Sequence, residues 1–344
     1  MKAKMWLEEL KAAPRKKAMP VLSFPSISLM GITVKELIGD SGLQAKGMKL
    51  IADRIDASAS VSMMDLSVEA EAFGSEIRVS DDEVPTVISS LVNNMDEANA
   101  LAVPPVGAGR TGRYIEAIAK ACELITDRPV FAGVIGPYSL TGRLMGVSEA
   151  MINCYTEPEM VHVVMQKATS FLIDYISAYK TQTGAAGVVM AEPLTGMLSP
   201  DLAVQFSEPY VRQIVDTVQD DDFIVIYHNC GDNTIQMIDS ILRTGSAAFH
   251  FGNAISMKEM LTHIPSDVVA MGNVDPAGQF RNGTPDSIRE ETKRILSECC
   301  PDHPNFVISS GCDIPPTSSW DNIDAFFEAV GEYYDSTENK CIPD

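Results

Sequence analysis

Short apolar runs of strand length recur along the whole chain, and stretches with apolar residues at helical spacing separate most of them. Parallel strands need long crossover connections, usually helices, so this alternation predicts one parallel sheet with helices packed around it. Eight such runs favour closure of the sheet into a single (β/α)8 TIM barrel. The runs lie at residues 18–24, 60–66, 129–136, 187–192, 223–230, 247–252, 267–273 and 305–312.

The chain has 344 residues, which suits one barrel of this kind, and we expect residues 1–344 to form a single domain. A charged amphipathic stretch at about 1–17 predicts an N-terminal helical extension. The connection between the second and third runs is unusually long, so we expect an excursion at 67–109. The main predicted helices lie at 33–55, 110–126, 158–182, 199–219, 233–245, 256–264, 285–300 and 319–334.

Acidic residues outnumber basic ones by 47 to 26, which gives the chain a formal net charge of −21. Such a field repels phosphate backbones and anionic lipids, so we expect no nucleic-acid partner and no membrane partner. No apolar run approaches the roughly 18 residues of a membrane-spanning helix, and no stretch has the apolar core of a signal peptide. We therefore expect a cytoplasmic protein whose seven cysteines are free thiols or metal ligands.

Polar and ionisable residues gather at the ends of the predicted strands. In barrels of this type the active site lies at the carboxyl ends of the strands, so this arrangement indicates an enzyme. The residues at these ends are Asp65, Tyr138, Glu192, His228, Cys230, His250, Asn273, Asp275 and Cys312.

Three of these residues form a candidate metal centre. His228 and Cys230 are two positions apart, so in an extended strand their side chains point to the same face, which a barrel can turn toward its interior. Cys312 follows the last run in the corresponding place. One imidazole and two thiolates suit Zn²⁺, and three protein ligands leave a fourth position open for a substrate. A thiol bound there would lose its proton and act as a nucleophile.

The same residues have a simpler interpretation. An H-x-C sequence occurs by chance in many chains, and a buried cysteine commonly serves as a small apolar side chain. From spacing alone, a zinc site and ordinary packing both stay open.

Longer motifs resemble those of the uroporphyrinogen decarboxylase superfamily along nearly the whole chain. They are MMDLSVEAEAFG at 63–74, PVFAGVIGPYSLTGRLMG at 129–146 and MGNVDP at 271–276. The resemblance implies a single distorted (β/α)8 barrel and places Asp65 where the decarboxylases have their catalytic aspartate. Two departures argue against tetrapyrrole decarboxylation. Residues 15–31 lack the arginine-rich character of the decarboxylase segment, and Cys312 stands where those enzymes have a histidine.

The set His228, Cys230 and Cys312 is similar to the zinc motif of the methylcobamide:coenzyme M methyltransferase branch of that superfamily. The resemblance implies Zn²⁺ as cofactor, a corrinoid protein carrying methyl-Co(III), as in methylcobalamin, as methyl donor and partner, and a small thiol such as coenzyme M as acceptor. Two alternatives stay open. One is an enzyme that demethylates a methoxy or other methyl-donor substrate onto Co(I), and the other is a non-catalytic binding subunit of a corrinoid methyltransfer complex.

Strand-end position and resemblance together predict roles for four further residues. We expect Asp65 to orient the substrate or to take a proton, and Tyr138 to shape the wall that faces the methyl donor. Asn273 and Asp275 are expected to line the substrate pocket.

Glu192 is expected to contact the substrate, and Glu192 and His250 are also the two candidates for a fourth zinc ligand. Each could instead hold His228 or the loop after Cys230 in place, as residues next to metal ligands often do. An anionic group on the substrate would need a basic partner, and the candidates for it are Arg110, Arg113 and Arg143.

Overall fold

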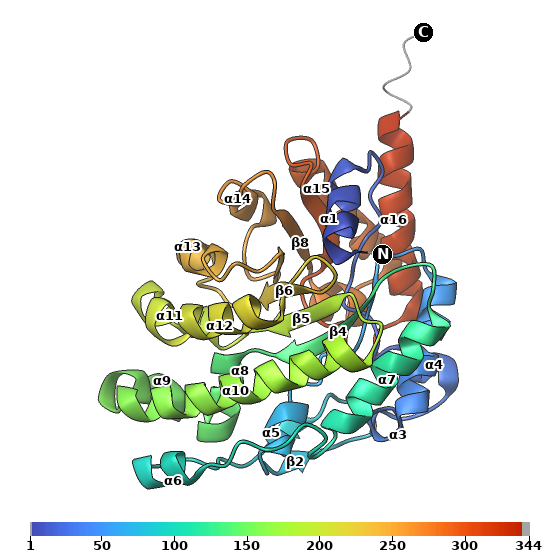
Figure 1. Cartoon of the computed structure of the whole chain (residues 1–344). Coiled ribbons are helices and arrows are strands. Elements are labelled where there is room, and N and C mark those ends of the chain that lie inside the picture. The colour runs from blue at the N-terminus through green and yellow to red at the C-terminus, as the bar shows by residue number, and fades with distance from the viewer. Residues whose placement is uncertain (1, 339–344) are drawn as a thin grey trace.

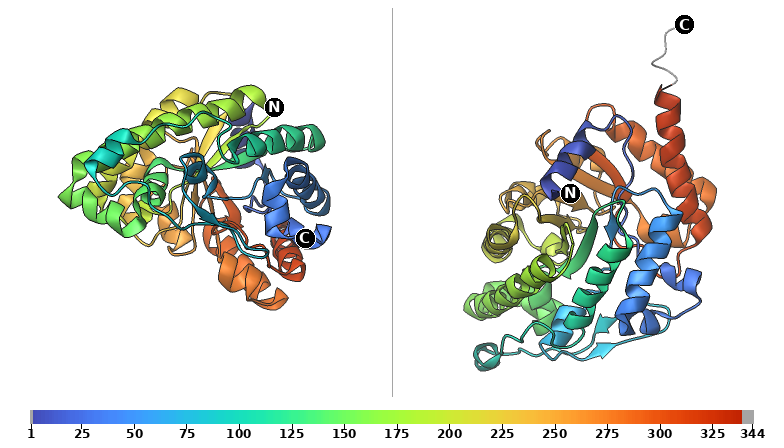
Figure 2. Two further views of the ribbon diagram at one scale, coloured as in Figure 1. Left: turned by 90° about the horizontal axis from the view of Figure 1, so that it is seen from below. Right: turned by 45° about the vertical axis from the view of Figure 1, so that its right-hand side comes forward.

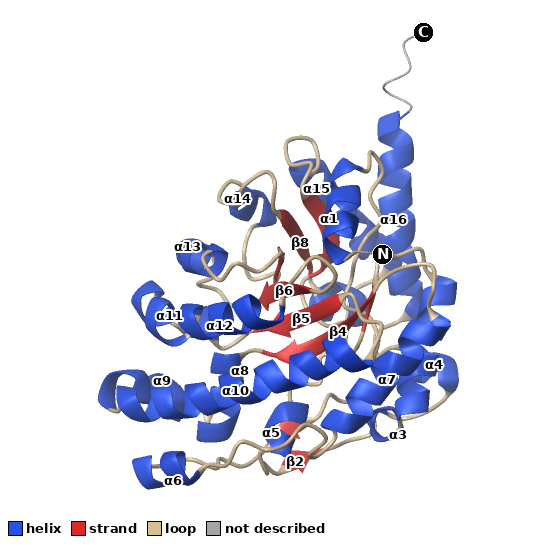
Figure 3. Cartoon of the chain, viewed as in Figure 1, coloured by secondary structure: helices blue, strands red, loops and turns tan. Residues whose placement is uncertain are grey.

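A computed structural model of the chain describes residues 2–338 and has a seven-stranded parallel sheet at its centre, surrounded by helices (Figures 1 and 3). The strands are adjacent in the order β1-β4-β5-β6-β7-β8-β9, and every neighbouring pair is parallel. The predicted α/β fold with a parallel sheet is therefore confirmed. The strands are β1 (Ser60–Val61), β4 (Val130–Ile135), β5 (Gly187–Ala191), β6 (Ile224–Asn229), β7 (Ala248–Phe251), β8 (Val269–Val274) and β9 (Phe306–Ser310).

Helices connect most successive strands and enclose the sheet, as the view from below in Figure 2 shows. None of the helices within residues 2–338 combines the length and the apolar character that crossing a bilayer requires. The helices are α1 (Ala3–Ala12), α2 (Ser26–Met30), α3 (Val34–Gly39), α4 (Ser41–Arg54), α5 (Val68–Ala72), α6 (Met95–Ala100), α7 (Thr111–Leu124), α8 (Pro137–Met145), α9 (Val147–Thr156), α10 (Pro158–Gln182), α11 (Pro200–Phe206), α12 (Glu208–Val218), α13 (Ile238–Leu242), α14 (Met257–Leu261), α15 (Pro285–Cys299) and α16 (Trp320–Glu338). Two short 3-10 helices, η1 (Thr195–Met197) and η2 (Ile235–Met237), and a π-helix, η3 (Pro276–Arg281), complete the set.

Two of the predicted helices are each divided in two. Residues 33–55 form α3 and α4, because Asp40 ends the first helix and its side chain accepts a hydrogen bond from Leu43 N at 2.8 Å to begin the second. Residues 199–219 form α11 and α12, with Pro209 in the first turn of α12. Proline is tolerated there because the first backbone N–H groups of a helix have no partner within it.

The first predicted strand, at 18–24, is wrong, because this segment forms no strand and the sheet has seven strands rather than eight. Pro20 lies within it, and proline cannot donate the backbone hydrogen bond that a ladder needs. The segment still bonds on both sides. Met19 N donates to the backbone of β9 at 3.0 Å, and Ala18 O accepts from Ser58 N at 2.9 Å.

The long connection between β1 and β4 leaves the main sheet, as expected for residues 67–109. It contains α5, α6 and a small antiparallel pair, β2 (Ile77–Arg78) and β3 (Thr86–Val87). Helix α6 projects away from the main body at the lower left of Figure 1.

Alternation along β6 decides which of its side chains face the inside of the curved sheet. Ile224 and Ile226 belong to an inner apolar cluster, whereas Val225 belongs to the larger cluster between the sheet and the helices. Because successive side chains of a strand point to opposite faces, the inner row continues with His228 and Cys230. The inner face of β6 is therefore apolar at the start of the strand and carries the two predicted ligands His228 and Cys230 at its end.

Helix α1 covers the amino-terminal end of the sheet. Trp6 and Leu10 join the inner apolar cluster, and the rings of Trp6 and Phe131 have centroids 5.2 Å apart. Trp6 Nε1 donates to Ser58 O at 3.1 Å. Since Ser58 lies two residues before β1, α1 lies at the opposite end of the sheet from the predicted site.

Candidate functional site

His228, Cys230 and Cys312 converge at the carboxyl end of the sheet, where β6 and β9 end. Their ligand atoms all lie within 4.8 Å of one another, and this is the only group of three or more such side chains found within residues 2–338. His228 is buried, and both cysteines are half-buried free thiols. The structure thus brings together the three residues that the sequence predicted as zinc ligands.

The surroundings of His228 suit a residue that binds a metal through Nε2. Its Nε2 atom is buried and has no hydrogen-bond partner, which is costly for a polar atom. One imidazole nitrogen and two sulfur atoms are a common donor set for zinc with an open fourth position.

The two thiols interact directly with each other. Hydrogen bonding with Cys312 lowers the pKa of Cys230, whereas the same contact together with burial raises the pKa of Cys312 to about 12. Cys230 therefore loses its proton more readily than an ordinary cysteine, and Cys312 loses it less readily. A bound dication would favour two thiolates, because metal binding to cysteine releases its proton.

His250 on β7 lies directly behind His228. Its Nδ1 is 2.7 Å from Nδ1 of His228, and its Nε2 is 2.7 Å from the hydroxyl of Ser309. Ser309 in turn donates to the main-chain oxygen of Met19 at 2.7 Å. Burial lowers the pKa of His250 well below its ordinary value. Both ring nitrogens of His250 are occupied by these contacts, and it lies outside the group of three.

Glu192, the other candidate fourth ligand, binds the amino terminus of α8. One of its oxygens accepts from Tyr138 N at 2.8 Å, and the other accepts from Ser139 N at 2.9 Å, Ser139 Oγ at 2.6 Å and Thr195 Oγ1 at 3.3 Å. Burial raises the pKa of Glu192 to about 7. Tyr138 is also fully buried, and its hydroxyl lies 3.5 Å from Cys154 Sγ. Neither residue belongs to the group of three.

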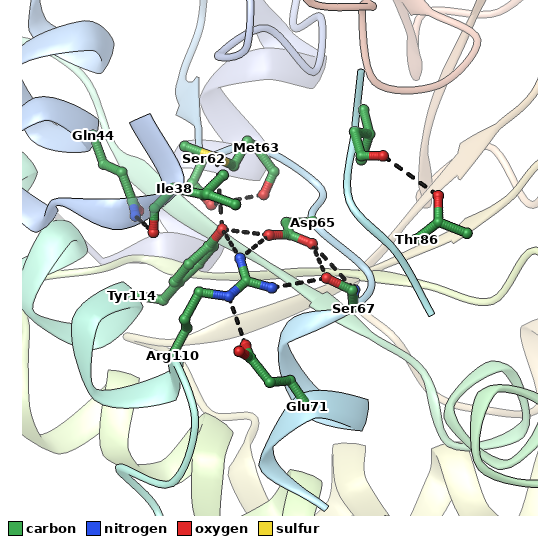
Figure 4. A network of polar contacts seen from close by, with 11 residues as sticks. Ile38, Gln44, Ser62, Met63, Asp65, Ser67, Glu71, Thr86, Arg110 and Tyr114 are labelled. Carbon is green, nitrogen blue, oxygen red and sulfur yellow. Dashed lines mark hydrogen bonds and ion pairs between the residues drawn. The ribbon is translucent and has the colours of Figure 1, made fainter. Parts of the chain in front are cut away.

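Asp65 lies in a buried network with Arg110, shown in Figure 4. Its Oδ2 accepts from the Tyr114 hydroxyl at 2.6 Å and pairs with Arg110 Nη1, while its Oδ1 accepts from Ser67 Oγ at 2.6 Å. Arg110 also donates to Glu71 at 2.6 Å and to Ser67 at 2.8 Å. The network joins the segment after β1 to α5 and to the start of α7, and it satisfies both oxygens of Asp65.

Asn273 and Asp275 line a hollow of about 360 Å³ beside α14 and α15, and none of the three predicted zinc ligands lines it. Asn273 Nδ2 donates to Gly252 O and Ile255 O, each at 2.9 Å. Asp275 Oδ1 accepts from two backbone N–H groups of η3 at 2.9 and 2.8 Å. Both side chains therefore shape loops near the site, and their predicted contact with substrate stays a prediction.

The three arginines considered for an anionic substrate group lie in different surroundings. Arg110 is held by the Asp65 network, and Arg113 is exposed. Arg143 is half-buried, its Nε has no hydrogen-bond partner, and burial lowers its pKa.

Sequence reasoning missed two residues next to the predicted ligands. Ser309 contacts the His250 ring. Its position could have been found from the sequence, because it is a polar residue two places after Val307, whose side chain faces the inside of the sheet. Asp313 follows Cys312, and its Oδ2 accepts from Met64 N at 2.7 Å, which ties the Cys312 loop to the segment after β1. Its Oδ1 is buried without a partner, and burial raises the pKa of Asp313 well above its ordinary value.

The parallel sheet and the convergence of three predicted ligands at the ends of β6 and β9 agree with the family to which the sequence matches. The chain belongs to the uroporphyrinogen decarboxylase (URO-D) family, whose model matches residues 15–333.

Methyltransferases and decarboxylases are both among the relatives of this chain. The methylcobamide:CoM methyltransferase MtbA of Methanosarcina acetivorans is 27% identical over 274 residues, which is 78% of each chain, and that of Methanosarcina mazei is 26% identical over the same length. The uroporphyrinogen decarboxylase of Alcanivorax borkumensis is 27% identical over 251 residues, which is 69% of each chain. These matches confirm the predicted resemblance to the family and to its methyltransferase branch.

A solved structure described as a methyltransferase from Methanosarcina mazei superposes with a TM-score of 0.84. The match covers 97% of this chain and 99% of that chain at 24% sequence identity. The two proteins therefore share one fold over nearly their whole lengths.

Proposed function

We propose that this chain is a zinc-dependent methyltransferase that moves a methyl group from a methylated corrinoid, carried by a partner protein, to a small thiol such as coenzyme M. The convergence of His228, Cys230 and Cys312, with His228 Nε2 buried and unpartnered, is the observation that supports it most. We infer the methylcobamide donor and the coenzyme M acceptor from the names of the methyltransferase relatives.

His228 Nε2 and the two sulfurs would hold Zn²⁺ and leave one position for the acceptor. Zinc, when bound, lowers the pKa of a thiol and keeps it as a nucleophilic thiolate at neutral pH. The thiolate sulfur forms a bond to the methyl carbon while the cobalt–carbon bond breaks. The electron pair of that bond stays on cobalt, so methyl-Co(III) becomes Co(I) and the thiol becomes a thioether.

We also propose the finer features of the fold that the sequence predicted. Residues 18–24 would take the eighth place beside β9 and β1 and close the sheet as a (β/α)8 barrel, with residues 1–344 as one domain and about 1–17 as its extension. We place the activity in the cytoplasm, with a corrinoid protein as partner.

The test of the function is the change in cobalt absorbance when free methylcobalamin is mixed with zinc-loaded protein and a panel of thiols that includes coenzyme M. We expect thiol-dependent loss of the methyl-Co(III) spectrum and about one zinc ion per chain. Cys312→Ala should lose both the bound zinc and the turnover. Cys122→Ala, which removes a half-buried thiol from α7, is the matched control and should keep both.

The other outcomes separate the alternatives. No turnover with any thiol, in a protein that binds zinc, would refute the proposed direction, and methyl transfer from methoxy donors to Co(I) would then be measured. Full turnover in Cys312→Ala would show that the three ligands do not carry the reaction. No transfer in either direction would favour a non-catalytic subunit of a corrinoid complex.

A further inference from the structure

A line of four polar groups runs through the interior from the segment at 18–24 to the candidate zinc ligand. It consists of Met19 O, the Ser309 hydroxyl, the His250 ring and the His228 ring, and each successive contact is 2.7 Å long. The three side chains are almost completely buried: Ser309 is 0% exposed, His250 2% and His228 1%. Water therefore has little access to replace any of these contacts.

The direction of every hydrogen bond follows from the first group. Met19 O can only accept, so the single proton of the Ser309 hydroxyl is donated to it. The Ser309 oxygen must then accept from His250, which places the proton of that ring on Nε2. A neutral imidazole carries one N–H, so Nδ1 of His250 is an acceptor, and the proton between the two rings belongs to His228 Nδ1.

The other end of the line gives the same answer independently. His228 Nδ1 is also 3.2 Å from the main-chain oxygen of His250, which can only accept. Two acceptors thus face His228 Nδ1 and hold its proton there. The remaining nitrogen, Nε2, keeps a free lone pair, and it is the atom found buried without a hydrogen-bond partner.

We propose that Ser309 and His250 are positioning residues that hold His228 in the Nδ1–H tautomer, so that Nε2 is aimed at Cys230 and Cys312 as a ready metal ligand. The inference rests on the metal site of the proposed function. The line makes the segment at 18–24 part of the site, because its main chain supplies the acceptor that orders all the protons. Outer partners of this kind orient metal-bound histidines and commonly change metal affinity by roughly 10- to 100-fold when removed.

The proton positions are measured first, by long-range ¹H–¹⁵N NMR of metal-free protein labelled at its five histidines. His228→Gln assigns the His228 signals by their loss. We expect the wild type to show the His228 proton on Nδ1 alone. Ser309→Ala should give a mixture of tautomers for His250 and His228, since the acceptor that orders His250 is gone. Ser75→Ala removes a buried hydroxyl that has no hydrogen-bond partner and lies outside the line, so it should keep the wild-type spectrum.

Zinc affinity is measured next, by competition with a chromophoric chelator. Ser309→Ala and His250→Phe should each weaken zinc binding by roughly 10- to 100-fold. His250→Gln should recover most of the affinity, because its amide oxygen can accept from His228 and its amide nitrogen can donate to Ser309. Recovery of zinc affinity in His250→Gln would show that the hydrogen bonds of His250 matter and not its packing, because Gln fills the space of the ring less well than Phe does. Thermal unfolding of each variant checks that it is folded at the assay temperature.

Two outcomes would overturn the inference: a wild-type His228 that carries its proton on Nε2, or zinc affinities of Ser309→Ala and His250→Phe equal to that of the wild type. A wild type that binds no zinc would instead refute the metal site of the proposed function. The spectra of the metal-free proteins would still decide whether Ser309 and His250 fix the tautomer.

Discussion

Glu69 is buried beside the end of β4, and only one of its two carboxylate oxygens accepts a hydrogen bond from another residue. Its Oε1 accepts from Ile135 N at 3.0 Å, whereas its Oε2 is buried without a hydrogen-bond partner. Burial raises the pKa of Glu69 to about 7 from an ordinary value of 4.5. Between these two values the unfolded chain loses the proton and the folded chain keeps it. The free energy of unfolding therefore falls as the pH rises from about 4.5 to 7 and levels off above that range.

Glu69→Gln should remove this part of the pH dependence, because an amide stays neutral. From pH 5 to pH 8 we expect the free energy of unfolding of the variant to fall by about 2 to 3 kcal/mol less than that of the wild type. Urea unfolding at the two pH values measures the difference. Glu76→Gln changes an exposed glutamate of the same segment and should leave the pH dependence as it is. Parallel curves for Glu69→Gln and the wild type would contradict the assignment.

Elements far apart in the chain are locked together through Arg110. Its guanidinium is buried and pairs with Asp65 after β1 and with Glu71 on α5, while its own residue lies at the start of α7. Removing the arginine would leave Asp65 buried without its counter-charge. A buried charge that loses its partner destabilises a protein more than the pair stabilises it.

Arg110→Met is expected to lower the free energy of unfolding by about 3 to 5 kcal/mol. The double variant with Asp65→Asn should recover much of this loss, because it removes the unpaired charge. Arg113→Met changes an exposed arginine of the same helix and should cost no more than about 0.5 kcal/mol. Equal stability of Arg110→Met and Arg113→Met in urea would show that the network does not hold these elements.

The single variant Asp65→Asn addresses the predicted catalytic role of Asp65. Asp65→Asn that is folded and binds zinc, yet shows no methyl transfer, would support that role. Unchanged turnover would assign Asp65 to structure alone.

At the scale of the whole molecule, the apolar packing beneath α1 and the predicted site lie at opposite ends of the sheet. Helix α1 packs Trp6 into the inner cluster at the amino-terminal end, and the three predicted ligands lie at the carboxyl end. TIM barrels commonly separate stabilising contacts from the active site in this way.

Trp6→Ala should therefore destabilise the protein by about 3 to 5 kcal/mol, because it opens a cavity beneath α1. At a temperature where the variant is folded, its methyl-transfer rate should stay within about twofold of the wild type, since no ligand moves. Met5→Ala is the matched control, because Met5 is 55% exposed on the same helix. A large loss of turnover in folded Trp6→Ala would mean that α1 and the site are coupled.

Local backbone periodicity accounts for what could be predicted from the sequence. Alternation in β6 placed His228 and Cys230 on one face whatever the rest of the fold, and the apolar runs marked seven of the strands that form. The family motifs were likewise continuous stretches that can be read without coordinates. Pro20 shows where the pattern fails, because an apolar run that lacks one backbone donor forms no strand at 18–24.

Contacts between distant segments were decided only by the tertiary structure. Asp65 and Glu192 both stand at strand ends, yet one is paired with Arg110 and the other binds the amino terminus of α8. His250 was expected either to bind the metal or to support a ligand. Its contacts with His228 and Ser309 favour the supporting role. Such partners depend on how the sheet curves and how its loops fold back. A sequence pattern gives the face on which a side chain lies, whereas the opposing atoms come from parts of the chain that only folding brings near.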